Sequence, residues 1–243
     1  IAMTLCAFFA IAFYNVIELI VIIATRFKRR HGLYFWSVVV ATWGIFPYSL
    51  GFIFKFFQVI SNNMVSITLV IVGWICMVTG QSVVMYSRLH LVVRNPRKIR
   101  WVLAMIIFSA VVGHIPIIIF AYGANSDNPS FWVPIYALYE KVQVTIFFLQ
   151  ETIIASLYAL ETYKLLKPAG NVRGKSTRKV MRDLIYVNIL VIILDIALLG
   201  TEYSGHYEIQ TSFKGALYSI KLKVEFKVLN QLISVTRAAS ENS

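Results

Sequence analysis

Charged residues and paired cysteines are both scarce in this chain of 243 residues. Only 14% of the residues are charged and 58% are hydrophobic, whereas soluble globular domains carry about 25% charged residues. This composition excludes an ordinary soluble domain and predicts a membrane protein. The two cysteines, Cys6 and Cys76, lie in separate apolar runs, which excludes a disulfide scaffold and a CxxC metal site.

Several motifs of well-known chemistry are also missing. The chain has no phosphate-binding P-loop and no HExxH helix, so phosphate cradling and zinc hydrolysis have no support. It has no DDxxD segment, as a magnesium-dependent cyclase that ionises a diphosphate would require. The net charge of +12 is divided among short loops instead of forming a binding stripe, so we expect no nucleic-acid partner.

The chain does contain apolar runs that are long enough to cross a bilayer. Three connections, at residues 26–32, 88–100 and 164–182, hold 16 of the 23 Lys and Arg residues, and the alternate connections hold almost none. Basic connections of membrane proteins lie in the cytosol. The sequence therefore predicts an all-α polytopic membrane protein, a single seven-transmembrane-helix bundle with its N-terminus outside and its C-terminus in the cytosol. The expected helices are residues 2–25, 33–54, 64–86, 101–122, 135–163, 184–203 and 215–235.

Polar residues interrupt the sixth run at regular intervals. Asn188, Asp195 and Glu202 are seven residues apart, and because a helix drifts only about 20° per heptad, all three project from one stripe. A carboxyl group inside a membrane is costly and normally faces the interior of a helix bundle. The stripe therefore predicts a buried site that extends through three depths of the membrane.

Other carboxyl groups are expected near the same level. With a rise of about 1.5 Å per residue, Glu151, Asp195 and Glu225 lie near mid-membrane on three different helices. If they face one another, burial and like charge keep at least one of them protonated. A purely structural interpretation stays open, in which Asp195 or Glu151 pairs with Lys221 or Lys223 and only links helices. The supporting polar residues are Glu18, Gln81 and Asn188 in the cytosolic half, and His114, Glu202 and Lys221 in the outer half.

Four segments resemble a family of fungal seven-helix membrane proteins: GLYFWSVVVATWGIFPYSLGF, GWICMVTGQSVVMYSRLHLVVRN, MRDLIYVNILVIILDIALL and KGALYSIKLKVEF. The resemblance covers nearly the whole chain. It extends to the membrane-bound terpene cyclases of fungal meroterpenoid pathways, of the ascofuranone and macrophorin type. This resemblance implies an isomerase of secondary metabolism that protonates an olefin or epoxide on a farnesyl-bearing aromatic and closes a ring. The WE-containing pattern of the pyripyropene-type cyclases is absent, and the resemblance assigns no catalytic residue.

These observations lead to the hypothesis of a membrane-embedded, acid-initiated terpene cyclase. A lipid-soluble substrate would enter from the bilayer, and a carboxylic acid kept neutral by burial would donate the proton. The candidate acid is Asp195 or Glu151. Its hydrogen-bond partner, or the base that removes the final proton, is the other of these two residues, Glu225 or Glu202. Such an enzyme would lie in the endoplasmic reticulum membrane and would need neither metal nor cofactor. Aromatic side chains expected to line its cavity are Trp43, Trp74, Phe147 and Tyr158.

A receptor or sensor is the alternative function. Arg88 ends the third run in MYSRLHLV, where receptors keep an arginine that contacts the sixth helix or a G protein. The basic segment 164–182 would then contact a cytosolic protein partner at the plasma membrane. However, no acidic residue adjoins Arg88, the seventh run lacks an NPxxY pattern, and a plain positive-inside role for Arg88 is open.

Two further expectations depend on the lysines of the seventh run. A retinal protein, with Lys221 or Lys223 as the Schiff base, has little support because the third run offers no carboxylate as counter-ion.

An enclosed cavity lined by carboxyl groups and aromatics would favour catalysis. Tight pairing of Asp195 with Lys221 in the absence of a cavity would favour a structural role.

Overall fold

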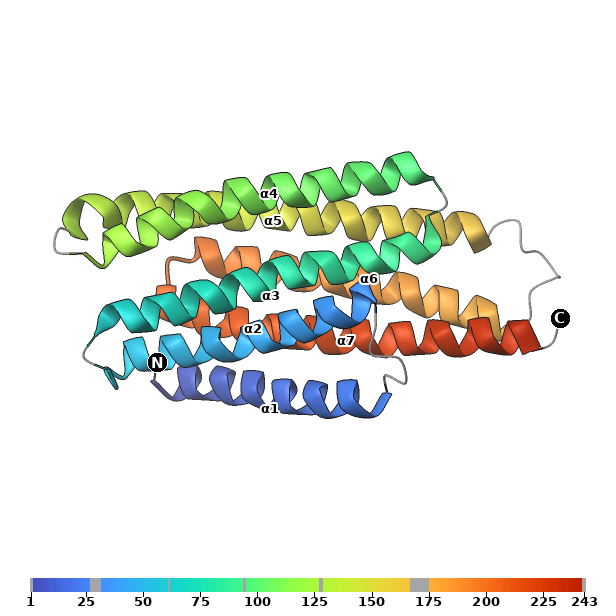
Figure 1. The fold of residues 1–243 in the computed structure, drawn as a ribbon, viewed down its shortest axis with the longest axis horizontal. Coiled ribbons are helices and arrows are strands. Elements are labelled where there is room, and N and C mark those ends of the chain that lie inside the picture. The colour runs from blue at the N-terminus through green and yellow to red at the C-terminus, as the bar shows by residue number, and fades with distance from the viewer. Residues whose placement is uncertain are drawn as a thin grey trace.

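The described residues of the computed structural model form an all-helical bundle without strands (Figure 1). The structure describes residues 2–26, 32–60, 62–93, 95–126, 129–166 and 175–241, with residues 26, 91, 165–166, 175–181 and 227–241 described by their backbone alone. The helices are α1 (Ala2–Arg26), α2 (Leu33–Phe56), α3 (Asn63–Val92), α4 (Pro96–Ala124), α5 (Pro129–Leu166), α6 (Lys175–Tyr203) and α7 (Tyr207–Glu241).

Local sequence signals set the starts of two helices. The Asn62 side chain accepts a hydrogen bond from the backbone N–H of Met64 at 3.0 Å and caps α3. In the same way Asn95 accepts from Arg97 at 3.0 Å and caps α4. Pro96 follows this cap at the first helical position, where a missing backbone N–H costs nothing.

The helices follow the order of the predicted apolar runs but are longer than several of them. Helix α5 begins at Pro129, α6 at Lys175 and α7 at Tyr207, each several residues before the apolar run predicted from 135, 184 or 215. Hydropathy marks only the apolar part of a helix, whereas the backbone hydrogen bonds continue through polar turns. Six helices within the described residues, α1 to α6, are long and apolar enough to cross a membrane.

The distribution of side chains suits a lipid environment. Large apolar side chains such as Phe108, Ile115 and Ile193 are exposed, whereas Arg88 and Lys221 are buried. A charged interior under an apolar exterior is the pattern expected when the surrounding solvent is hydrocarbon. Together with the six apolar helices, this pattern is consistent with an integral membrane protein.

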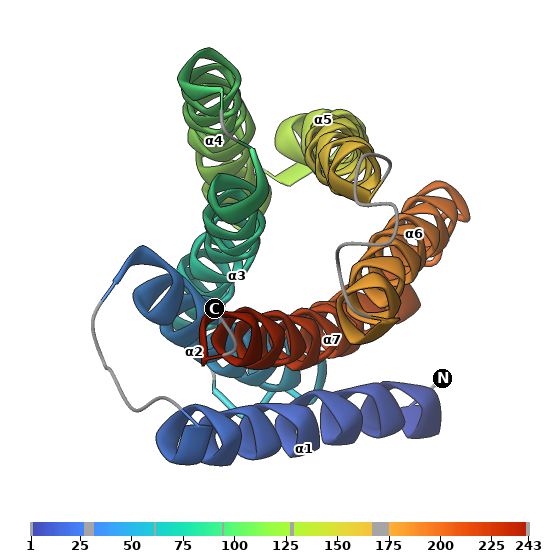
Figure 2. The same ribbon diagram turned by 90° about the vertical axis from the view of Figure 1, so that its right-hand side faces the viewer.

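Helix α7 occupies a central place in the bundle. It packs against α1, α2, α3 and α6, and the end-on view places α3, α5, α6 and α7 around a shared interior (Figure 2). The most extensive packing joins α2 and α3. There a Cβ on Gly73 would overlap the backbone of Tyr48, and one on Gly44 would lie 2.5 Å from the backbone N of Met77. These glycines let the two backbones approach closely, as small residues do in membrane bundles.

Candidate functional site

Buried charged side chains line the interior between α3, α5, α6 and α7. Among the described residues, five buried Asp and Glu side chains accompany three buried Lys and Arg side chains. These eight charged side chains and two buried amide side chains form three groups along the bundle, as judged by their contacts. We name these the cavity cluster (Glu140, Glu202, Gln210, Lys214), the central cluster (Glu151, Asp195, Lys221) and the Arg88 cluster (Arg88, Asn188, Glu225).

The central cluster joins α5, α6 and α7 through one lysine. The Lys221 ammonium donates hydrogen bonds to Asp195 and, at 2.9 Å, to Glu151. The Tyr218 hydroxyl donates to the other oxygen of Glu151 at 3.4 Å, and the Lys221 ammonium lies 4.6 Å from the centre of the Tyr218 ring. The expected pairing of Asp195 and Glu151 with Lys221 is therefore confirmed, which strengthens the structural interpretation of these two carboxylates.

The Arg88 cluster joins α3 to α6 and α7. The Arg88 Nη2 lies 3.3 Å from Glu225 Oε1 and 3.5 Å from Asn188 Oδ1, and the guanidinium carbon lies 5.1 Å from the centre of the Tyr158 ring. Arg88 is only 1% exposed. A plain positive-inside role for Arg88 is therefore wrong, because this side chain is an interhelical contact and not a solvated loop charge.

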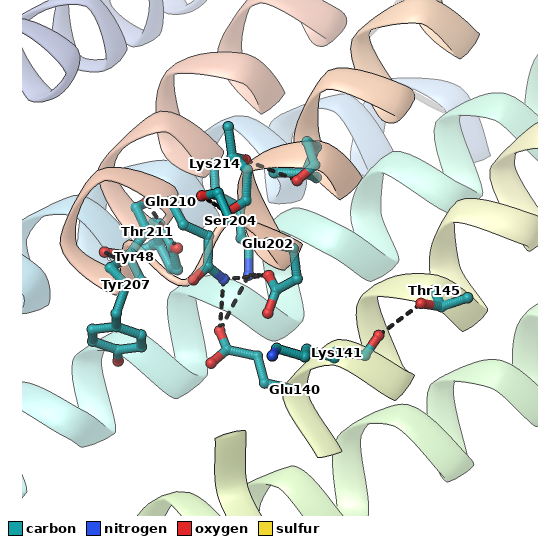
Figure 3. A network of polar contacts seen from close by, with 12 residues as sticks. Tyr48, Glu140, Lys141, Thr145, Glu202, Ser204, Tyr207, Gln210, Thr211 and Lys214 are labelled. Atoms are coloured by element: carbon teal, nitrogen blue, oxygen red, sulfur yellow. Dashed lines mark hydrogen bonds and ion pairs between the residues drawn. The ribbon is translucent and has the colours of Figure 1, made fainter. Parts of the chain in front are cut away.

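The cavity cluster, like the central cluster, contains two carboxylates and one lysine, and it also contains Gln210 (Figure 3). Lys214 of α7 lies 3.4 Å from Glu140 Oε1 of α5 and 3.5 Å from Glu202 Oε2 of α6. Gln210 donates to Glu140 at 3.2 Å and also to Glu202. Both donors reach the same oxygen of Glu140, so its second oxygen carries no hydrogen bond from the described residues.

A cavity of about 360 Å³, which we name the large cavity, adjoins the cavity cluster. It lies at the end of the bundle away from the three basic connections, and Glu140 and Lys214 form part of its wall. Lys55 also borders it, with its ammonium 5.6 Å from the centre of the Tyr207 ring. The remaining wall is mostly apolar. Its aromatic members are Tyr48, Phe52, Trp74, Tyr136 and Tyr207.

A second cavity of about 20 Å³ separates the cavity cluster from the central cluster. Lys214 borders it from one cluster, and Glu151 and Asp195 border it from the other. Gln143 and Trp74 line both cavities. Asp195 and Glu151, the predicted acids, thus face a space of the size of one water molecule instead of a substrate cavity.

The predicted supporting residues separate into different surroundings. Glu18 pairs with Lys223 between α1 and α7 and is partly exposed, so it lies apart from the three clusters. His114 Nε2 lies 2.7 Å from the hydroxyl of Thr79. Gln81 lies beside Glu225 of the Arg88 cluster.

The four predicted aromatic residues do not share one cavity. Trp74 lines both cavities and Phe147 lines the smaller one. Tyr158 is buried against Arg88. The prediction for Trp43 is wrong, since this side chain is 55% exposed and borders a separate groove of about 370 Å³ between α1 and α2.

The predicted depths need two corrections. Lys221 was expected in the outer half, but it contacts Glu151 and Asp195 and therefore lies at their level. Glu225 was expected at that level, but it contacts Arg88 one turn further along α7. The error has a physical source, because counting along one helix does not fix which residues of the neighbouring helices lie level with it, whereas the contacts of Lys221 with α5 and α6 do.

Sequence reasoning missed Glu140, Gln210 and Lys214 as site residues. Lys214 lies one residue before the predicted seventh run, which begins at 215. A seven-residue spacing that recurs on two helices could have identified Lys214. Lys214 and Lys221 are seven residues apart on α7, as Asp195 and Glu202 are on α6, so each pair lies on one stripe.

The fold and the buried clusters define a class, an all-helical membrane-type bundle with an ionisable interior. Residues 1–243 match the family described as Domain of unknown function (DUF7703), and the chain belongs to this family. No curated protein and no solved structure matches the chain. Within the described residues, no three His, Cys, Asp or Glu side chains are placed to hold a metal ion.

Proposed function

We propose that the chain crosses the membrane seven times, with its N-terminus outside and its C-terminus in the cytosol. Helix α7 is the seventh span in this proposal. Charged residues lower its hydropathy, but Lys214, Lys221, Lys223 and Glu225 contact residues of α1, α3, α5 and α6. The alternation of basic and nearly neutral connections supports the orientation.

We further propose that the 360 Å³ cavity binds a lipid-soluble small molecule. The observation that carries this proposal is a mostly apolar cavity in contact with one carboxylate and two ammonium groups. Its volume lies within the range of about 300–1,000 Å³ that is typical of small-molecule sites. An aromatic wall with few polar groups suits a prenylated aromatic compound better than a polar metabolite.

The reaction that fits this cavity is metal-independent, acid-initiated cyclisation, with Glu140 as the proton donor. Glu140 is preferred over Asp195 and Glu151 because it borders the large cavity and has an oxygen without a hydrogen bond from the described residues. The five buried carboxyl groups outnumber the three buried cations, and Lys55 at the cavity adds only one more. An uncompensated buried charge is costly, so at least one carboxyl group retains a proton.

The chemistry is balanced without a co-reactant. A proton from Glu140 adds to an olefin carbon, or to an epoxide oxygen with cleavage of its C–O bond. A neighbouring double bond attacks the resulting cation and forms a C–C bond, and the aromatic wall stabilises the positive charge. A carboxylate then removes a proton, so that the product is an isomer of the substrate. Glu202, which shares Lys214 and Gln210 with Glu140, is placed to return that proton.

The test is Glu140→Gln in microsomes that are supplied with prenylated phenols and their epoxides, read by mass spectrometry. Loss of a general acid lowers turnover by about 10²–10⁴-fold. The matched control is Glu161→Gln, which removes a carboxylate from a partly exposed pair with Lys98 and should leave turnover unchanged. Near-normal turnover in Glu140→Gln removes the acid assignment, and no consumption of any compound by the unaltered protein removes the enzyme proposal.

One observation favours the receptor or sensor as a second candidate. Arg88 of α3 is buried and contacts α6 and α7 through Asn188 and Glu225, as a lock between helices would. In that case the partner is a cytosolic protein at the plasma membrane, and opening would separate Arg88 from Glu225. Arg88→Gln should then raise basal activation of a G protein in a reconstituted assay, and unchanged activation would remove this candidate.

A further inference from the structure

We propose that the central cluster stores an exchangeable proton and that a relay through the small cavity connects it to the large cavity. This inference concerns the chain's own protons and requires no substrate. If the proposed cyclase reaction also holds, the relay links the stored proton to the cavity cluster, where Glu140 and Glu202 exchange the proton of the reaction. The residues of the relay come from α5, α6 and α7, which contribute to both clusters.

The geometry arranges the ionisable groups in a line. On α7, Lys214, Tyr218, Lys221 and Glu225 are spaced four, three and four residues apart and therefore share one face. With a rise of about 1.5 Å per residue, Lys214 and Lys221 are about 10 Å apart along the axis. A proton cannot cross that distance in one step, so intermediate groups are required.

The small cavity supplies the intermediate position. It is bordered by Lys214 on one side and by Glu151 and Asp195 on the other, and its 20 Å³ suffice for one water molecule. The Asp195 Oδ2 is buried and has no hydrogen-bond partner among the described residues. Buried polar atoms of this kind are satisfied by ordered water, so a water between Asp195 and Gln143 completes the line to the large cavity.

Charge balance puts the proton in the central cluster. Two carboxylates there face one ammonium, and Glu225 cannot draw on that ammonium alone because it already pairs with Arg88. One shared proton makes the central cluster neutral, which the low dielectric of the interior favours. The charged and titratable groups that face the central cluster from the packed helices are Arg88 (α3), Glu151 (α5), Asp195 (α6), and Lys214, Tyr218, Lys221 and Glu225 (α7).

The Arg88 cluster closes the line at its other end. Arginine stays charged at all physiological pH values, and its fixed positive charge repels a passing proton. Arg88 lies beyond Glu225 as seen from the central cluster. The stored proton therefore exchanges with the large cavity and not with the end of the bundle that carries the basic connections.

Infrared difference spectroscopy of the purified protein in lipid nanodiscs tests the proposal without a substrate. At neutral pH the unaltered protein should show a carbonyl band of a protonated carboxyl group. Asp195→Asn and Glu151→Gln each leave one carboxylate facing Lys221, so the central-cluster band should be lost in both. It should persist in Glu140→Gln, which abolishes the proposed turnover, and in the control Glu161→Gln.

Exchange into heavy water tests the relay itself. The band should shift on transfer to D₂O, and Gln143→Leu, which places an apolar side chain beside both cavities, should slow that shift. A spectrum of the unaltered protein without a protonated-carboxyl band overturns the proposal. So does a band that is unchanged in both Asp195→Asn and Glu151→Gln, and an unaltered exchange rate in Gln143→Leu overturns the route.

Discussion

Replacing Lys221 by methionine removes the one ammonium that contacts both Asp195 and Glu151. The substitution preserves most of the side-chain volume, so its effect on packing is small. It leaves two buried carboxylates without their cation in a region where Lys221 is 0% exposed. The prediction is a large loss of stability that arises from electrostatics and not from a cavity.

The size of the expected loss in the free energy of unfolding follows from the burial of the ion pair. Removal of one partner from a buried ion pair costs about 3–5 kcal/mol in free energy of unfolding. Lys221 serves two carboxylates, so we expect the upper part of that range, limited by uptake of a further proton. Lys223→Met is the matched control on the same helix, because Lys223 and Glu18 are each 34% exposed. Solvent screens that pair, and its loss should cost only about 0–1 kcal/mol.

The assay is denaturant unfolding in mixed micelles, followed by circular dichroism. Lys221→Met should unfold at a much lower denaturant fraction than Lys223→Met. Adding Asp195→Asn and Glu151→Gln to Lys221→Met should restore most of the stability, because a buried ionic group replaced as a whole costs little. Equal stability of the two lysine variants, or no recovery in the triple variant, would refute the reasoning.

Two further predictions concern packing and the cavity wall. Gly73→Ala should lower the free energy of unfolding by about 1–3 kcal/mol, because its Cβ meets the backbone of Tyr48. Gly200→Ala, with nothing within 4 Å, should change it by about 0.5 kcal/mol or less. Trp74→Leu should lower turnover of a prenylated phenol about 30-fold, from a lost cation–π contact of about 2 kcal/mol. Trp43→Leu, on the separate groove, should leave turnover unchanged.

The sequence predicted the helical architecture because apolar length is a local property. It left the pairing of Asp195 with Lys221 open as one interpretation, since a buried carboxylate requires a nearby cation, and the structure contains this contact. The stripe of Asn188, Asp195 and Glu202 is confirmed as a buried face of α6. The stripe depends on spacing within one helix, which the sequence displays directly.

The partners between helices could not be predicted in the same way. Lipid tails are as apolar as a protein core, so hydropathy does not distinguish the exposed Trp43 from the buried Trp74. In the sequence Arg88 stands in a basic connection, and only the packing of α3 against α7 places it beside Glu225. Glu140 lies eleven residues before Glu151 on α5, but its cavity depends on where α2, α4 and α7 end and begin.

Photoaffinity labelling tests most directly whether the large cavity is the substrate site. A farnesyl phenol that carries a diazirine would be irradiated in membranes with this protein, and the labelled peptides would be sequenced by mass spectrometry. Labelling should concentrate on cavity residues such as Phe52 and Tyr207 and should be displaced by an unreactive prenylated phenol. Labelling confined to exposed apolar residues such as Trp43 and Ile115, without displacement, would contradict the assignment.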